Sequence, residues 1–198
     1  MRKEKIEELR SYIEELKTKK KELLDKNSKF LKVERYNCDL NNGKTIVREK
    51  LLKGNGNGSA VTILPVTVGN NVILTVQPRV FTESTIGIDF PAGYVEPNEE
   101  YKKAALRELQ EETGYISNDL REVVKYYQDD GVSAALNRGY VALDCIKVSG
   151  QNLDPGEFIR YFECNIDELF ELYEKGYIQG GGSQLLFEKS KEFLKERR

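Results

Sequence analysis

Short apolar stretches alternate with amphipathic ones from residue 60 onward, and this order restricts the folds that the chain can adopt. The short stretches are rich in residues that favour β-strands, and the longer ones have helical spacing. A mixed order of strands and helices predicts an α/β fold, in which helices cover the faces of a sheet. The predicted strands are Ala60–Leu64, Val66–Val68, Val72–Val76, Glu122–Tyr127, Tyr140–Val148 and Phe158–Glu163, and the predicted helices are Glu99–Thr113, Ile166–Lys175 and Gln184–Glu196.

The N-terminal segment Arg2–Asp25 has the pattern of a charged amphipathic helix. Its apolar residues trace a narrow stripe of heptad type along one side of a helix. Two interpretations stay open: a helix that docks on its own domain, and a helix that binds a partner or a second copy. The stripe consists of Ile6, Leu9, Ile13, Leu16 and Leu23.

A β-hairpin is predicted between this helix and the alternating region. Two stretches with strand character, Phe30–Leu40 and Lys44–Leu52, flank a sequence that favours a tight turn, Asn41-Asn42-Gly43. The glycine-rich stretch 54–59 then leads into a strand, whereas a phosphate-binding loop would lead into a helix. We therefore expect a flexible joint there, and three parts in the chain: a helix (1–27), an arm with its joint (28–58) and a main domain (59–198).

The composition limits the chemistry and the surroundings of the protein. A chain of 198 residues with a net charge of −2 has no basic excess for nucleic acid or an anionic membrane. No apolar run approaches ~18 residues and the N-terminus is charged, so we expect a soluble, cytoplasmic protein. The three scattered cysteines are expected to be buried thiols. The chain contains no His, which excludes His-based catalytic triads and imidazole metal sites. Its chemistry must depend on carboxylates, cations, backbone groups or hard metals.

The stretch from Asn98 to Gly114 predicts a helix that carries several carboxylates. Asn98 suits the N-cap, two glutamates follow it where the helix dipole favours negative charge, and Gly114 suits the end of a helix. At 100° per residue, Glu108, Glu111 and Glu112 project from one wedge about 100° wide. Crowded carboxylates of this kind either stay in solvent or need protons or a cation.

Arg107 stands four residues before Glu111 and is expected to pair with it. Glu108 and Glu112 would then remain as an oxygen clamp for a hard divalent ion such as Mg²⁺ or Mn²⁺. The competing interpretation is an acidic helix face exposed to solvent. The residues on both sides of the helix favour the metal site.

The spacing of residues around this helix resembles the Nudix box, G-x5-E-x7-R-E-U-x-E-E-x-G-U. The resemblance implies an α/β fold of the Nudix type, an α-β-α sandwich around a mixed β-sheet, here with an N-terminal helix and a β-hairpin arm. It also implies an enzyme that binds divalent metals and hydrolyses a nucleoside diphosphate linked to another group. The matching residues are Gly93, Glu99, Arg107-Glu108-Leu109, Glu111-Glu112 and Gly114, and only Tyr115 departs from the final aliphatic position.

Further segments are similar to the ADP-ribose/ADP-sugar pyrophosphatases of that family. This similarity implies a nucleoside diphosphate sugar as substrate, with ADP-ribose-like compounds favoured and AMP and a sugar phosphate as products. The hairpin is similar to the dimerising arm of that subfamily, which implies a homodimer. Asp130 stands where the subfamily usually has proline, so another nucleoside diphosphate derivative or a dinucleotide stays open as substrate. The similar segments are Gln77-Pro78-Arg79, Phe90–Gly93, Glu157-Phe158-Ile159, Ile166–Leu169, Gly176-Tyr177-Ile178 and Ser183.

The resemblance also assigns roles to residues of the box. Arg107 is expected to orient the carboxylates, Glu111 to act as a ligand or beside the ligands, and Glu99 to brace the loop before the helix. The expected metal ligands all offer oxygen: Glu108, Glu112, Glu111 and the backbone carbonyl of Ala92.

Outside the box, a general base is expected from a later loop, as in similar enzymes. Glu157 occupies that place, and Asp154 is the second candidate. Arg79 is expected to bind phosphate or the terminal ribose, since a guanidinium fork fits phosphate. Tyr36 is a candidate to stack on a base across a dimer, and Asp130 lies where the substrate is selected. A non-catalytic regulator that binds nucleotide sugars is the alternative to an enzyme.

Overall fold

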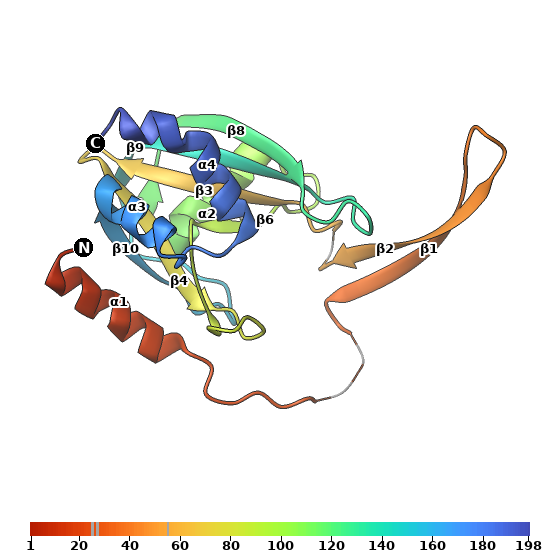
Figure 1. The fold of residues 1–198 in the computed structure, drawn as a ribbon, viewed down its shortest axis with the longest axis horizontal. Helices are drawn as coiled ribbons and strands as arrows, with labels where there is room; N and C mark the ends of the chain where they lie inside the picture. Colours follow the sequence, from red (N-terminus) through yellow and green to blue (C-terminus); the bar gives the residue numbers. More distant parts are fainter. Residues whose placement is uncertain (25, 27, 55) are drawn as a thin grey trace.

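The computed structural model describes residues 1–24, 26, 28–54 and 56–198 (Figure 1). None of the helices in these ranges combines the length and the apolarity that a membrane span requires. The helices are α1 Lys3–Leu16, α2 Tyr101–Thr113, α3 Ile166–Glu174 and α4 Gly181–Lys195. The strands are β1 Leu31–Asp39, β2 Thr45–Lys53, β3 Ala60–Thr67, β4 Asn71–Pro78, β5 Ile86–Asp89, β6 Ala92–Tyr94, β7 Tyr115–Ile116, β8 Asp119–Tyr127, β9 Leu136–Lys147 and β10 Arg160–Asn165.

The body of the protein is built on one mixed sheet, in which β3 lies at the centre. The strand order is β10-β4-β3-β9-β7, with β5 beside β4, β6 beside β3 and β8 beside β9. Strands β3 and β9 are parallel, and the other neighbours are antiparallel. Strand β3 is apolar along nearly its whole length because both faces of the sheet are covered there. The predicted α/β class with a mixed sheet is therefore confirmed.

Helices cover both faces of the sheet and enclose a hydrophobic cluster on each side (Figure 1). Helix α2 covers one face and buries Ala104, Ala105 and Leu109. Helices α3 and α4 cover the other face, where Leu169 and Phe187 are fully buried. This arrangement makes α2 the outer layer of one side, with its opposite surface free to carry charged residues.

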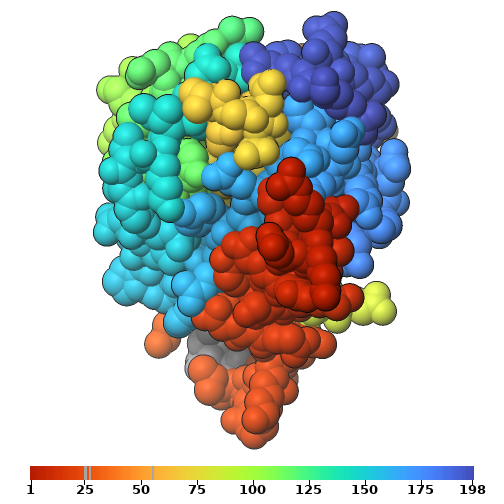
Figure 2. Space-filling view, turned by 90° about the vertical axis from the view of Figure 1, so that its left-hand side faces the viewer, coloured from red at the N-terminus to blue at the C-terminus, as the bar shows by residue number. Residues whose placement is uncertain are grey.

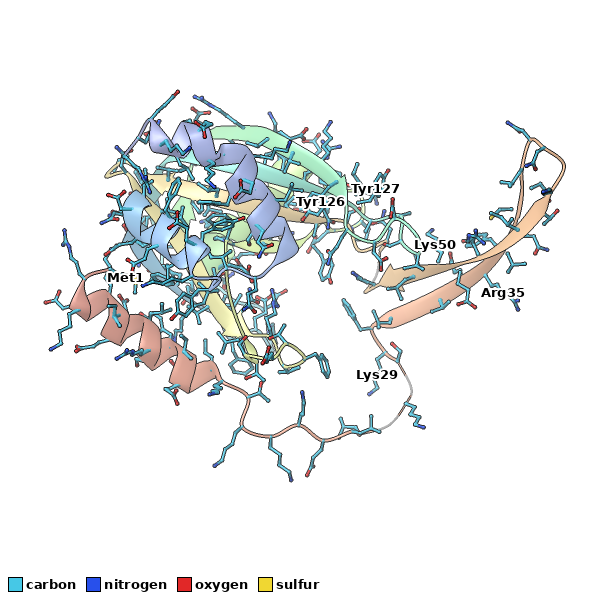
Figure 3. The ribbon with its side chains drawn as sticks, in the orientation of Figure 1. Met1, Lys29, Arg35, Lys50, Tyr126 and Tyr127 are labelled. Atoms are coloured by element: carbon cyan, nitrogen blue, oxygen red, sulfur yellow. The ribbon has the colours of Figure 1, made fainter. Side chains whose placement is uncertain are left out.

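Strands β1 and β2 form a separate two-stranded hairpin that projects from the body (Figures 1 and 3). Their bounds lie within one residue of the predicted strands, and Gly43 takes the left-handed conformation that a tight turn needs, with φ at 79°. Arg35 stands well away from the body, and Cys38 is half-buried on the arm, whereas Cys145 and Cys164 are buried as expected. Asn55 of the predicted joint lies outside the described residues.

Helix α1 is shorter than predicted, because it ends at Leu16. The next residues include four lysines between 17 and 21 and offer no apolar side chain to bury. Leu23 of the predicted stripe is 79% exposed, and the predicted end at Asp25 lies outside the described residues. The part that does form docks on its own body beside β10, where Leu9 is buried (Figure 2).

Two further helix starts differ from the prediction. Helix α2 begins at Tyr101, and Asn98 lies in the preceding turn with φ at 66°, so its predicted role as the N-cap is wrong. The backbone of Glu96 is held by Glu99 instead, which keeps the chain in a turn before the helix. Helix α4 starts at Gly181, before the predicted Gln184. Strands β5, β6 and β7 were not predicted, because they are too short to show a pattern.

Candidate active site

The carboxylate of Glu108 packs directly on the backbone of Gly93, which lies in β6. A Cβ atom on residue 93 would overlap that carboxylate, so only glycine fits there. Gly114 ends α2 in the left-handed conformation with φ at 77°, as predicted, and a Cβ there would collide with the backbone oxygen of Ser149. Two glycines thus fix the helix against its neighbouring loops.

Arg107 lies at the centre of the charged residues on α2. Its Nη1 donates to Glu108 Oε1 at 2.8 Å and to Glu111 Oε2 at 2.9 Å. Its Nε and Nη2 donate to the two oxygens of Glu99 at 2.9 and 3.0 Å, and Nη2 also reaches the backbone oxygen of Tyr94. The predicted pair with Glu111 is present, and Arg107 also binds Glu108, one of the two residues expected to form the oxygen clamp. The adjacent carboxylates hold the pKa of Arg107 well above its usual value.

Glu108 and Glu112 are buried carboxylates with incomplete charge compensation. Their exposed fractions are 8% and 2%. Burial raises the pKa of Glu108 to about 7, although Arg107 opposes the shift. Burial, and then the charge of Glu108, raises the pKa of Glu112 well above its usual value. Glu112 Oε2 accepts one hydrogen bond, from the backbone N–H of Ala92 at 3.0 Å.

Two buried carboxylates that repel each other fit a hard divalent cation, because the cation would remove the repulsion and use oxygen ligands. Glu108 and Glu112 are therefore the residues that could hold it. Across residues 1–24, 26, 28–54 and 56–198, no group of three or more Asp, Glu, His or Cys side chains is arranged so that it could hold a metal ion by itself. Ala92 contacts Glu112 through its backbone N–H, whereas the atom expected as a metal ligand is its carbonyl oxygen.

The loop between β9 and β10 brings Glu157 toward the buried pair. The charge of Glu157 contributes to the raised pKa of both Glu108 and Glu112, which places it near them. Two bonds join this loop to the end of α2: Gln151 Nε2 donates to the backbone oxygen of Glu112 at 2.6 Å, and Asn152 N donates to that of Glu111 at 2.8 Å. Glu157 itself is exposed and accepts a bond from the backbone of Asp154.

Arg79 follows the end of β4 and lies beside Asp89. Its side chain lies across Gly87, since a Cβ on that residue would be 2.7 Å from Arg79 Cγ. The positive charge of Arg79 lowers the pKa of both Asp89 and Glu112, so the guanidinium faces these two carboxylates. Arg79 is exposed, and a phosphate group could therefore reach it.

The remaining two sequence-predicted residues do not lie with these carboxylates. Tyr36 is on the projecting arm, 44% exposed, and its hydroxyl is bonded to Glu34 of the same strand. Asp130 is exposed in the loop between β8 and β9. That loop meets the base of the arm, where the backbone N–H of Leu51 donates to the oxygen of Val132 at 2.7 Å.

Sequence reasoning missed Asp89, a buried carboxylate of this region. Its Oδ1 accepts the backbone N–H of Gly180 at 3.0 Å, at the start of α4. Burial raises the pKa of Asp89, and Ser183, Gly180 and Arg79 oppose that shift. The only signal in the sequence is a lone acid before the Phe90-Pro91-Ala92 turn. Its hydrogen-bond donor Gly180 is 91 residues away along the chain, so no local pattern could identify it.

Comparison with known proteins identifies this arrangement. The NUDIX domain family model matches residues 56–180, which include the buried pair, Arg79 and Glu157. The chain belongs to the Nudix family. It is accordingly an enzyme that acts on pyrophosphate bonds, and Nudix hydrolases generally use a divalent metal. The fit of Glu108 and Glu112 to such an ion agrees with this membership.

Individual Nudix relatives point to ADP-containing compounds. The chain is 34% identical over 137 residues to an ADP-ribose pyrophosphatase of Bacillus subtilis, covering 69% of this chain and 71% of the relative. It is 30% identical over 146 residues to a methanol dehydrogenase activator of Bacillus methanolicus, covering 73% and 76%. A crystal structure of an ADP compounds hydrolase superposes with a TM-score of 0.71 at 26% identity, covering 87% of this chain and 91% of that one.

Proposed function

We propose that this Nudix enzyme hydrolyses the diphosphate linkage of nucleoside diphosphate sugars, with ADP-ribose-like substrates favoured and AMP and a sugar phosphate as products. The observation that carries the proposal is the buried pair Glu108 and Glu112, within reach of the charge of Glu157 and, at Glu112, of the charge of Arg79. Relatives named as ADP-ribose pyrophosphatase and ADP-sugar pyrophosphatase support this substrate class. Three free cysteines agree with a reducing compartment such as the cytoplasm.

Glu108 and Glu112 would hold a divalent ion, Mg²⁺ or Mn²⁺, with Glu111 and the Ala92 carbonyl as further oxygen donors. A bound ion would supply positive charge against the negative charge that develops on the phosphoryl oxygens. Arg107 fixes Glu108 and Glu111 through the bonds of Nη1, so that both carboxylates keep one orientation. Fixed carboxylates cost little reorganisation when the reaction begins.

Glu157 removes a proton from the attacking water, and the proton is held on its carboxylate. Its loop is tied to α2 by Gln151 and Asn152, which keeps the base at a constant distance from the buried pair. Arg79 binds a phosphate of the substrate with its guanidinium fork. Asp130, in the loop between β8 and β9 at the base of the arm, contributes to the selection of the sugar or the nucleoside base.

We also propose that the arm (28–58) joins two copies of the chain, as a part distinct from the helix (1–27) and the main domain (59–198). The arm exposes Val33 by 63%, Val47 by 45% and Tyr36 by 44%. Exposed apolar side chains on the arm are unfavourable in solvent, and a second copy would cover them. Tyr36 then reaches the site of the partner and stacks on the nucleoside base.

The decisive experiment is a substrate screen with the purified protein. ADP-ribose, other nucleoside diphosphate sugars and dinucleotides are supplied with Mg²⁺ or Mn²⁺, and released phosphate monoesters are quantified by chromatography. We expect turnover of ADP-ribose to equal amounts of AMP and ribose 5-phosphate, and its loss in EDTA. A non-catalytic regulator would instead bind ADP-ribose without releasing either product. Full activity in EDTA would refute the metal mechanism.

A further inference from the structure

Helix α1 is anchored on the body through its middle and its end. Leu9 is only 5% exposed, in the cluster shared with α3 and α4. Arg160 of β10 binds Glu15 with two bonds, at 3.0 Å from Nε and 2.5 Å from Nη2. Lys5 Nζ donates to the backbone oxygen of Glu163 at 2.6 Å. The helix therefore presents the residues that follow it at a fixed place on the surface.

The segment directly after this helix, residues 17–21, touches a loop of the body; we name it the strap. The backbone N–H of Thr18 donates to Thr85 Oγ1 at 3.3 Å. Lys21 Nζ donates to the backbone oxygen of Val80 at 3.0 Å and lies 5.6 Å from the centre of the Phe81 ring. The strap thus holds both ends of the loop 79–85, although more than 50 residues separate them along the chain.

The loop 79–85 transmits these contacts to Arg79. The backbone N–H of Arg79 donates to the oxygen of Thr85 at 2.9 Å, and Thr82 donates to the oxygen of Arg79 through its N–H at 2.9 Å and its hydroxyl at 2.8 Å. Thr85 has φ at 59°, a conformation that a β-branched residue adopts only under constraint. A loop that stores such strain needs contacts from outside to keep its shape.

We propose that the strap positions Arg79 for the substrate, with Lys21 as its positioning residue. The inference rests on the proposed function of Arg79 as a ligand of the substrate phosphates. Lys21 does not touch the substrate; its Nζ holds the backbone oxygen of Val80, the direct neighbour of Arg79, by hydrogen bond and lies near the Phe81 ring. The N-terminal helix thereby contributes to substrate binding from a distance.

The test compares Lys21→Ala with Lys21→Arg, which keeps the donor, and with Lys19→Ala, an exposed lysine of the same strap as the control. Amide hydrogen exchange of residues 79–85 is measured by mass spectrometry, and KM and kcat are measured with ADP-ribose and Mg²⁺. In Lys21→Ala we expect the exchange rate of residues 79–85 and the KM to rise at least about threefold, which corresponds to the loss of one modest hydrogen bond. The kcat should stay within twofold of the parent value. Lys21→Arg should restore both values.

Unchanged exchange in Lys21→Ala would refute the claim that the strap holds the loop 79–85. Faster exchange with an unchanged KM would refute the claim that the strap positions Arg79. A fall in kcat as large as the rise in KM would point to general damage rather than positioning and would also overturn the proposal. If the parent protein does not hydrolyse ADP-ribose, the proposed function fails, and the exchange rates alone still decide whether the strap holds the loop.

Discussion

The carboxylate of Glu108 occupies the volume that a side chain on Gly93 would need. Gly93→Ala must therefore displace Glu108, one of the two carboxylates proposed to hold the divalent ion. We expect kcat with ADP-ribose to fall by ~10²-fold, since misplacing a reacting group by about 1 Å has that effect. Gly69→Ala is the control, because a Cβ there meets nothing closer than 3.8 Å. Wild-type turnover by Gly93→Ala would contradict the assigned role of Glu108.

Glu112→Gln separates metal binding from folding. Glu112 is 2% exposed, and an ionised carboxylate at that depth destabilises the fold, so glutamine should leave the Tm in EDTA unchanged or higher. We expect Mg²⁺ to raise the Tm of the parent and to leave the Tm of the variant unchanged. At a Mg²⁺ concentration 100 times the Kd, binding adds ~2.7 kcal/mol to the free energy of unfolding. Activity should fall by about 10²-fold or more.

The control for that variant is Glu100→Gln, at the start of the same helix, where the side chain is 73% exposed. Thermal unfolding is followed by circular dichroism, with and without Mg²⁺. An equal Mg²⁺ effect on the parent and on Glu112→Gln would remove Glu112 from the ligand set.

Glu157→Gln tests the assignment of the general base. Removal of a general base typically lowers kcat by ~10²–10⁴-fold, whereas KM and the effect of Mg²⁺ on Tm should remain. Asp154→Asn, in the same loop, is expected to retain the activity of the parent. If Asp154→Asn loses activity and Glu157→Gln keeps it, the two assignments are exchanged. Steady-state kinetics with ADP-ribose give both parameters.

Asp89 predicts a pH dependence of stability. Burial raises its pKa in the folded state above that in the unfolded chain. The folded state therefore binds more protons, and the contribution of Asp89 to stability is lost as the pH rises through the folded pKa. Asp89→Asn does not titrate and keeps an acceptor for Gly180. Its stability relative to the parent should increase as the pH rises from the ordinary range of an Asp carboxyl through the raised pKa of Asp89, as measured by urea unfolding with EDTA. A constant difference would show that Asp89 has an ordinary pKa.

The arm makes the oligomeric state testable. Val33→Asp replaces an exposed apolar side chain of β1 by a charge and should convert a dimer into monomers at micromolar concentration, because burying an unpaired charge is costly. Asn42→Asp, in the turn at the tip, is the control and should remain dimeric. Light scattering after gel filtration gives both masses. A monomeric parent protein would refute the dimer, and with it the role of Tyr36 across the interface.

Spacing along the sequence determined which residues share the acidic face of α2, where that helix ends, and where the hairpin strands lie. These features depend on neighbours a few residues apart, so helical and strand periodicity is enough to predict them. The box residues, Gly93 and Gly114 among them, fall where their pattern requires.

Only the tertiary structure decided the partners of those residues. Arg107 binds Glu108 as well as Glu111, Asp89 meets Gly180, and α1 stops at Leu16 and docks beside β10. The contacts of Asp89 and of α1 join residues on separate elements, and their geometry depends on how the sheet brings the elements together. Burial has the same origin: a glutamate in a sequence has its ordinary pKa until packing removes the water around it.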